Sequence, residues 1–136
     1  MKVFIDASII IYLNVKLPRE EARKVEDFWL KILNEELYTN VLVLDEVVYI
    51  SKVKYGISVK DTLEFIDKAI LPYVEILPLR LEEYIKAKEF MLKYKLKPSD
   101  ALHLATMDIN GIPVIATEDR DFDKTHVKRI WIENFL

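Results

Sequence analysis

The chain has 136 residues, of which 51% are hydrophobic and 32% are charged, and its formal net charge is −3. This length suits one domain over residues 1–136 with a core of its own. The chain has no cysteine, which excludes disulfides and thiolate metal sites, and no apolar run approaches the ~20 residues that span a membrane. Met1 and Lys2 lead directly into the first strand and leave no room for a signal peptide, so we expect a cytoplasmic protein. The slightly negative charge counts mildly against a nucleic-acid binder, although a cluster of site carboxylates would itself lower the total.

The first predicted element is a buried strand that ends at an acid. Residues 3–5 (VFI) form an apolar run with strong strand preference, which suits a strand covered on both faces. Asp6 follows at once, and a carboxylate in such a place is costly to bury. Ser8 then precedes the apolar run 9–13, which predicts the start of a helix. In open α/β sheets, sites form at the carboxyl ends of strands, so Asp6 is the first candidate site residue.

The rest of the chain alternates between helical and strand patterns. Apolar residues at spacings of three and four predict a helix from Arg19 to Leu37, followed by a short extended link at Tyr38 and Thr39. Strands that alternate with helices of about ten or more residues imply βαβ units, a parallel sheet and right-handed crossovers. The further predicted elements are a helix over 41–54 capped by Asn40 and ended by Gly56, a helix capped by Ser58 and stopped by Pro72, a strand over 74–77, helices over 81–95 and from Pro98 to near Gly111, and strands over 114–116 and 129–132.

Four acids are expected to gather at one edge of this sheet. Asp6 and Asp119 follow apolar strands, Asp100 lies in the first turn of its helix, and Glu46 lies among apolar residues of another helix. Each has an ordinary explanation taken alone: a helix dipole favours Asp100, and Asp119 with Asp121 can make an Asx turn. Together they would repel one another unless a cation lies between them. Oxygen ligands suit Mg²⁺ or Mn²⁺, and the chain has no His pair or Cys set for zinc.

Four motifs in order resemble the PIN-domain family, and within it the single-domain toxins of VapC type. They are VFIDASIIIY from Val3, LDEV from Leu44, PSDALHLA from Pro98 and VIATEDRDF from Val114. The resemblance spans residues 3–132 and implies an α/β/α sandwich and a ribonuclease that depends on Mg²⁺ or Mn²⁺. It also implies an antitoxin partner and products with a 5′-phosphate and a 3′-hydroxyl. The apolar helices over 44–70 are expected to provide surface for a homodimer or for that antitoxin. It implies catalytic roles for Asp6, Glu46, Asp100 and Asp119. It implies that Asp121 is a further metal ligand or holds a water, and that Ser8, where many relatives have Asn, and Thr117 are small polar residues near the metal.

These roles combine into a hypothesis for the site. Asp6, Asp100 and Asp119 bind the principal ion, and Glu46 completes the shell through water or a second ion. The lysines at 93, 95 and 97 form a charged run, which we expect to be a solvated face of the protein. The alternative is that these lysines contact phosphates of the RNA. His103 lies among apolar residues and is expected to be a packed core residue. The tyrosines and tryptophans fall mostly at apolar helical spacings, which indicates core or dimer contacts rather than platforms for base stacking.

Rival classes can be compared at the same residues. A phosphatase of the haloacid dehalogenase type needs a second Asp two residues after the first, where this chain has Ser8. A receiver domain needs paired acids before its phospho-acceptor, and that arrangement is missing. A protein- or RNA-binding module built on the same scaffold, without cleavage, is the alternative from a different class. The pattern leaves open which RNA is cut, which ion is used and whether one or two ions bind.

Overall fold

The computed structural model describes residues 1–135, and a parallel sheet forms its centre. Within these residues the sheet has five strands in the order β3-β2-β1-β4-β5, every neighbouring pair parallel. The chain fills the sheet outward from β1 to one edge and then to the other, so the strand order reverses between β1 and β4. In open α/β sheets the crevice outside the carboxyl ends at this point is where ligands bind. The strands are β1 (Lys2–Ile5), β2 (Glu36–Asn40), β3 (Val74–Leu77), β4 (Val114–Ala116) and β5 (Lys128–Ile130).

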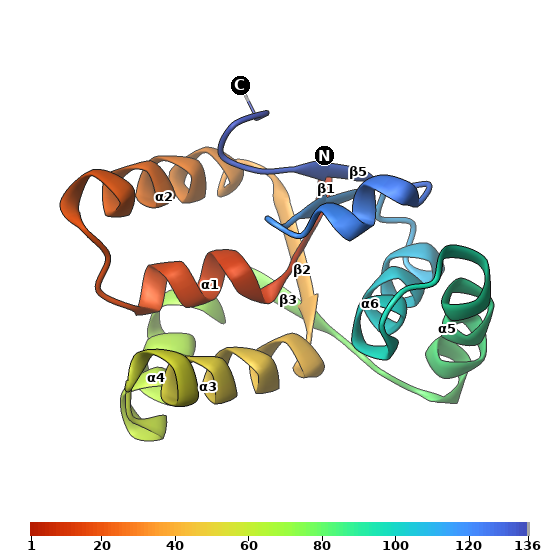
Figure 1. Cartoon of the computed structure of the whole chain (residues 1–136), viewed down its shortest axis with the longest axis horizontal. Helices are drawn as coiled ribbons and strands as arrows, with labels where there is room; N and C mark the ends of the chain where they lie inside the picture. Colours follow the sequence, from red (N-terminus) through yellow and green to blue (C-terminus); the bar gives the residue numbers. More distant parts are fainter. Residues whose placement is uncertain (136) are drawn as a thin grey trace.

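Helices cover both faces of the sheet (Figure 1). On one side lie α1 (Ala7–Asn14), α2 (Arg19–Ile32), α3 (Val41–Tyr55) and α4 (Val59–Phe65), which the π-helical turn η1 (Ile66–Ile70) extends; on the other lie α5 (Leu81–Tyr94) and α6 (Pro98–Ile109). The 3₁₀ segment η2 (Arg120–Lys124) connects β4 to β5. The predicted α/β/α sandwich with a parallel sheet is thereby confirmed. Among residues 1–135, no helix combines the length and the apolar character needed to cross a membrane.

The predicted helix from Arg19 to Leu37 extends five residues too far. α2 ends at Ile32, and residues 36–40 form β2, which pairs with β1 on one side and β3 on the other. Leu37 follows Leu33 by four positions, so the helical spacing continues across the true boundary. Leu37 is 4% exposed because it lies in the core opposite Val3. Burial in the sheet therefore overrides a local pattern that fits a helix equally well.

Several predicted helix ends are confirmed. Asn40 caps α3 by accepting a hydrogen bond from Val43 N, and Ser58 caps α4 by accepting one from Asp61 N. Gly56 ends α3 in the left-handed region at φ 69°, where a side chain would be strained. The last strand ends at Ile130 rather than at residue 132, because the Trp131 N–H turns away to the side chain of Asn134.

Candidate active site

Thr117 joins the acids that end β1 and β4. The Thr117 hydroxyl donates to Asp6 Oδ2 at 2.8 Å and accepts from Asp119 N at 3.1 Å. Asp6 Oδ1 accepts from Ala7 N at 2.8 Å, so the same carboxylate caps α1. The prediction that neighbouring parallel strands bring Asp6 and Asp119 to one edge is therefore met in the structure, with Thr117 between them.

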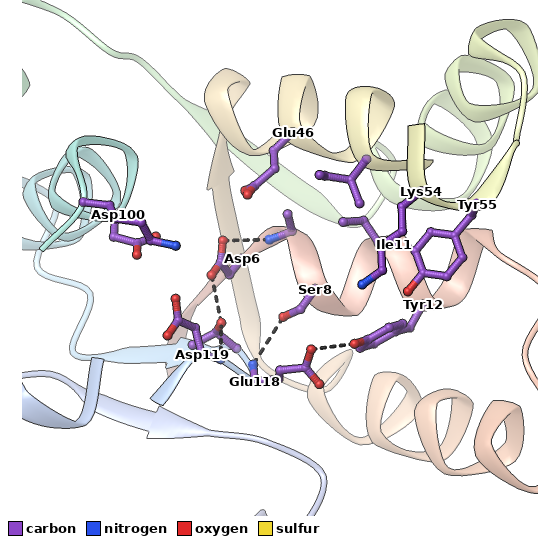
Figure 2. A pocket seen from close by; sticks show the side chains of 14 residues that line it. Asp6, Ser8, Ile11, Tyr12, Glu46, Lys54, Tyr55, Asp100, Glu118 and Asp119 are labelled. Carbon is purple, nitrogen blue, oxygen red and sulfur yellow. Dashed lines mark hydrogen bonds between the residues drawn. The ribbon is translucent and has the colours of Figure 1, made fainter. Parts of the chain in front are cut away.

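Two helices on opposite faces of the sheet bring the remaining acids to this edge (Figure 2). Asp100 comes from the first turn of α6, and Glu46 comes from α3. Both line, with Asp6 and Asp119, a pocket of about 420 Å³. One ligand atom each from Asp6, Glu46 and His103 lie within 4.8 Å of one another. Ligand atoms of Asp100, Asp119 and Asp121 also lie within 4.8 Å of one another. The five candidate acids therefore fall into two clusters.

The pocket disfavours ionisation of its more buried carboxylates. Burial, together with the negative charges of Asp6 and Asp119, raises the pKa of Asp100 to about 7. Burial and the same two acids also raise the pKa of Glu46. The charge of Lys97 acts in the opposite direction on the pKa of Glu46 and of Asp100. Asp100 Oδ2 is buried and has no hydrogen-bond partner within the described part of the chain. A buried carboxylate oxygen without a partner, facing three further carboxylates, fits a hard divalent cation as its missing partner.

His103 is fully buried beside this cluster, as expected of a core residue, but its ring also faces Asp6. Asn40 Oδ1 accepts from Val43 N, so the Asn40 amide nitrogen must be the donor to Thr106 Oγ1 at 3.1 Å and to His103 Nδ1 at 3.2 Å. The proton of the neutral ring therefore lies on Nε2. Nε2 is 3.8 Å from Asp6 Oδ1 and has no hydrogen-bond partner among residues 1–135. A ring nitrogen that carries a proton has no lone pair for a metal ion, so Nε2 of this tautomer is not a metal ligand.

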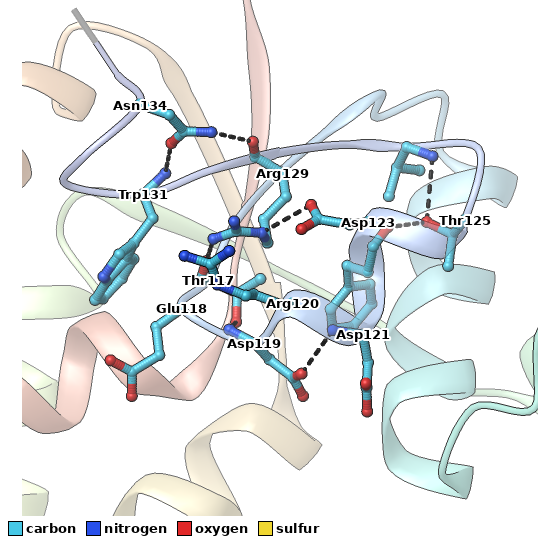
Figure 3. A network of polar contacts seen from close by, with 12 residues as sticks. Thr117, Glu118, Asp119, Arg120, Asp121, Asp123, Thr125, Arg129, Trp131 and Asn134 are labelled. Carbon is cyan, nitrogen blue, oxygen red and sulfur yellow. Dashed lines mark hydrogen bonds and ion pairs between the residues drawn. The ribbon is translucent and has the colours of Figure 1, made fainter.

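Hydrogen bonds from Arg129, and one to Ser8, fix the loop that carries Asp119 (Figure 3). Arg129 is 8% exposed, and its guanidinium donates to Thr117 O at 3.2 Å and to Asp123 Oδ1 at 2.9 Å. Asp119 in turn caps η2 by accepting from Asp121 N at 2.9 Å, which is the predicted Asx-type turn. Ser8 Oγ accepts from Glu118 N at 3.3 Å, so it fixes the same loop from α1. These contacts set where the carboxylate of Asp119 can lie.

Several pocket residues were not predicted from the sequence. Tyr12, Lys54 and Tyr55 line the pocket opposite the acids, although tyrosines were expected in the core or at a dimer contact. Of the lysine run at 93, 95 and 97, Lys97 lines the pocket. A signal was present for α3, because Glu46 and Lys54 are eight positions apart and therefore lie on one face of the helix.

Comparison with known proteins assigns the family. The PIN-domain family model matches residues 3–128, so the chain belongs to the PIN-domain family, as its motifs indicated. PIN domains of VapC type are nucleases, and PIN nucleases generally use a divalent metal. A comparison with curated protein sequences gives no match.

Solved structures share the fold at low sequence identity. VapC20 from Mycobacterium tuberculosis, a toxin that cleaves the sarcin-ricin loop, is 17% identical with a TM-score of 0.72, and the match covers 89% of this chain and 92% of that one. FitAcB from Neisseria gonorrhoeae is 17% identical with a TM-score of 0.73, over 98% of this chain and 99% of that one. VapBC2 from Rickettsia felis, solved with a promoter DNA fragment, is 14% identical with a TM-score of 0.70, over 96% and 98%. The fold of the chain is that of the VapC and FitB toxins.

Replacement of Asp100 by Asn is expected to stabilise the metal-free protein. Because folding raises the pKa of Asp100 from 3.8 to about 7, its contribution to stability is complete below pH 3.8 and is lost as the pH rises to about 7. At pH 8 without metal, Asp100→Asn should gain roughly 2–4 kcal/mol in urea unfolding, and the gain should vanish near pH 3.5. Asp45→Asn, at the exposed acid beside Glu46, is the control. A gain that is independent of pH would contradict this account.

The second prediction concerns the protonation of His103. Burial lowers the pKa of His103, against the opposing charge of Asp6, so the ring should take up a second proton only below its ordinary value of 6.5. Long-range ¹H–¹⁵N NMR should show an unprotonated Nδ1 and a protonated Nε2. The chain has two histidines, so a His126→Gln variant leaves only the signal of His103. A ring that is half protonated on both nitrogens at or above pH 6.5, or a proton on Nδ1 of the neutral ring, would contradict the assignment.

Proposed function

We propose that this protein is a ribonuclease that hydrolyses RNA phosphodiester bonds with Mg²⁺ or Mn²⁺, and that it is the toxin of a toxin-antitoxin pair. The observation that carries the proposal is the pocket at the β1–β4 reversal, which gathers four carboxylates and leaves the buried Asp100 Oδ2 without a partner. Membership of the PIN-domain family supports nuclease chemistry there. The proposal covers the whole chain as one nuclease domain in the cytoplasm.

Asp6, Asp100 and Asp119 are the residues that would hold the ion, with Glu46 and Asp121 completing the set. A bound divalent cation supplies positive charge that stabilises the phosphoryl oxygens in the transition state and favours attack by water. Thr117 keeps one Asp6 oxygen fixed by donating to it, and Ala7 N fixes the other, so this carboxylate is already oriented before any ligand arrives. An oriented ligand set avoids reorganisation during the reaction.

Glu46 is the carboxylate proposed to orient the attacking water and to accept its proton. Its side chain lies across the pocket from Asp6, and its raised pKa brings it closer to the working pH than an ordinary Glu. Lys97 lines the same pocket and places an exposed ammonium beside the acids, where it can meet a phosphate of the RNA. In this proposal the four carboxylates act at the phosphodiester bond that is cut, while Lys97 contacts the substrate backbone.

The proposed partners are RNA as substrate, an antitoxin and a second copy of this chain in a homodimer. Support for an antitoxin comes from the structural neighbours, since VapBC2, FitAcB and a Klebsiella pneumoniae pair are solved as toxin-antitoxin assemblies. Support for an RNA substrate comes from VapC20, which cleaves the sarcin-ricin loop. The particular RNA depends on the shape of the groove around the acids.

Cleavage of RNA tests this proposal. Wild-type protein should cut a mixed set of structured and single-stranded RNAs with Mn²⁺ or Mg²⁺ and should not cut them in EDTA. Asp6→Asn and Asp100→Asn should each lower the rate by roughly 100-fold or more, because each removes a negative ligand for the ion. Asp67→Asn, at an exposed acid of η1 outside the pocket, is the matched control and should cut at the wild-type rate.

Two results would contradict the proposal. Cutting that persists in EDTA, or in well-folded Asp100→Asn, would place the chemistry outside the carboxylate cluster. Absence of cutting by folded wild-type protein that binds Mn²⁺ would favour the scaffold alternative, in which the chain binds RNA or protein without cleavage.

A further inference from the structure

The acidic pocket continues away from the carboxylates between two helices. On α3, Glu46, Ile50 and Lys54 follow one another at spacings of four and line the pocket as one stripe. On α1, three residues line the same pocket and face the stripe on α3: Ser8, Ile11 and Tyr12. The eight positions from Glu46 to Lys54 correspond to about 12 Å along the helix axis. Asp6, Glu46, Asp100 and Asp119 lie at one end of the pocket. Lys54, Tyr55 and Tyr12 lie at the other, where Glu118 accepts a hydrogen bond from Tyr12 (Figure 2).

We call Tyr12, Ile50, Lys54 and Tyr55 the aromatic end of the pocket. Its two rings are partly exposed and partly packed against the core. The Tyr12 hydroxyl donates to Glu118, and its ring packs against Trp131 at 6.2 Å between centroids. The Lys54 ammonium lies 5.5 Å from the centroid of the Tyr55 ring. The aromatic end therefore combines fixed ring surface, aliphatic surface and a cation.

We propose that the aromatic end is a subsite for one unpaired nucleotide of the RNA, next to the bond that the acids cut. The base would stack on Tyr55 and contact Tyr12 and Ile50, and the phosphate would lie near Lys54. Stacking on aromatic side chains and cations along the backbone are the two contacts that single-stranded nucleic acids offer to proteins. This inference rests on the proposed ribonuclease function and adds the place in the pocket where one unstacked base of the substrate binds.

The structure favours RNA over a peptide as the occupant. The aromatic end and the carboxylates belong to one continuous pocket, so a ligand held at the ring surface extends directly to the candidate metal site. Lys54 lies at the aromatic end (Figure 2), and the charge of Lys97 acts on Glu46 and Asp100 among the acids, so both lysines place positive charge along this path. A duplex would be a poor ligand, because the bases of a helix are stacked on one another and have no free face for Tyr55.

Binding of short RNAs to the Asp100→Asn protein tests the subsite apart from cleavage. The probes are a fluorescein-labelled oligouridylate of about ten nucleotides, an abasic strand of equal length and the oligouridylate in a duplex, each with Mg²⁺. Tyr55→Leu should weaken binding of the oligouridylate about 5-fold or more and leave the abasic strand unchanged, since a stacked base contributes about 1–3 kcal/mol. Tyr55→Phe keeps the ring and should stay within about 2-fold. Tyr49→Leu, at an exposed tyrosine of α3 outside the pocket, should not change either Kd.

The outcomes separate this inference from the proposed function. Equal loss for the oligouridylate and the abasic strand, an unchanged Kd in Tyr55→Leu, or duplex bound as tightly as single strand would each overturn the subsite. An unchanged Kd in Tyr55→Leu would favour a protein partner as the ligand of the aromatic end. If wild-type protein cuts RNA while Tyr55→Leu binds normally, only the subsite fails. If no RNA is cut but binding depends on Tyr55 as described, only the nuclease proposal fails. Circular dichroism melts check that each variant is folded.

Discussion

Repulsion among carboxylates at the carboxyl edge of the sheet is the constraint on which the rest of this structure depends. Asp6, Glu46, Asp100 and Asp119 line one pocket, and burial removes the water that would screen them. Burial of Asp100 itself, and then the charges of Asp6 and Asp119, raise its pKa to about 7. An arrangement that costs stability in the free protein is characteristic of a functional site, because a cation that enters the pocket reverses the sign of the interaction.

The fold holds these acids in place with contacts that leave selected oxygens free. Thr117 and Ala7 N satisfy Asp6, and Arg129 fixes the Thr117 carbonyl behind the loop of Asp119. His103 Nε2 carries the ring proton 3.8 Å from Asp6 Oδ1, because Nδ1 accepts a hydrogen bond from Asn40. Asp100 Oδ2 has no such partner among the described residues. The structure thus orients the acids without neutralising them.

The sequence predicts the acids better than it predicts their surroundings. Parallel strands share a direction, so Asp6 and Asp119 could be placed at one edge from two apolar runs alone. β2 was missed because Leu37 continues the helical spacing of α2, and only its pairing with β1 decides the outcome. The aromatic end was missed because it depends on how α1 lies against α3, where Asn14 donates to Ser51 and Thr62. The tautomer of His103 depends on Asn40, 63 positions earlier in the chain.

Anomalous diffraction from crystals soaked in Mn²⁺ tests most directly the claim that this cluster is built around a cation. Mn²⁺ takes the same oxygen ligands as Mg²⁺ and gives its own scattering signal. The account predicts an anomalous peak within coordination distance of the carboxylates of Asp6, Asp100 and Asp119, and the loss of that peak in crystals of Asp100→Asn. A map with no peak in this pocket, or with its strongest peak at acids elsewhere on the surface, would contradict the account.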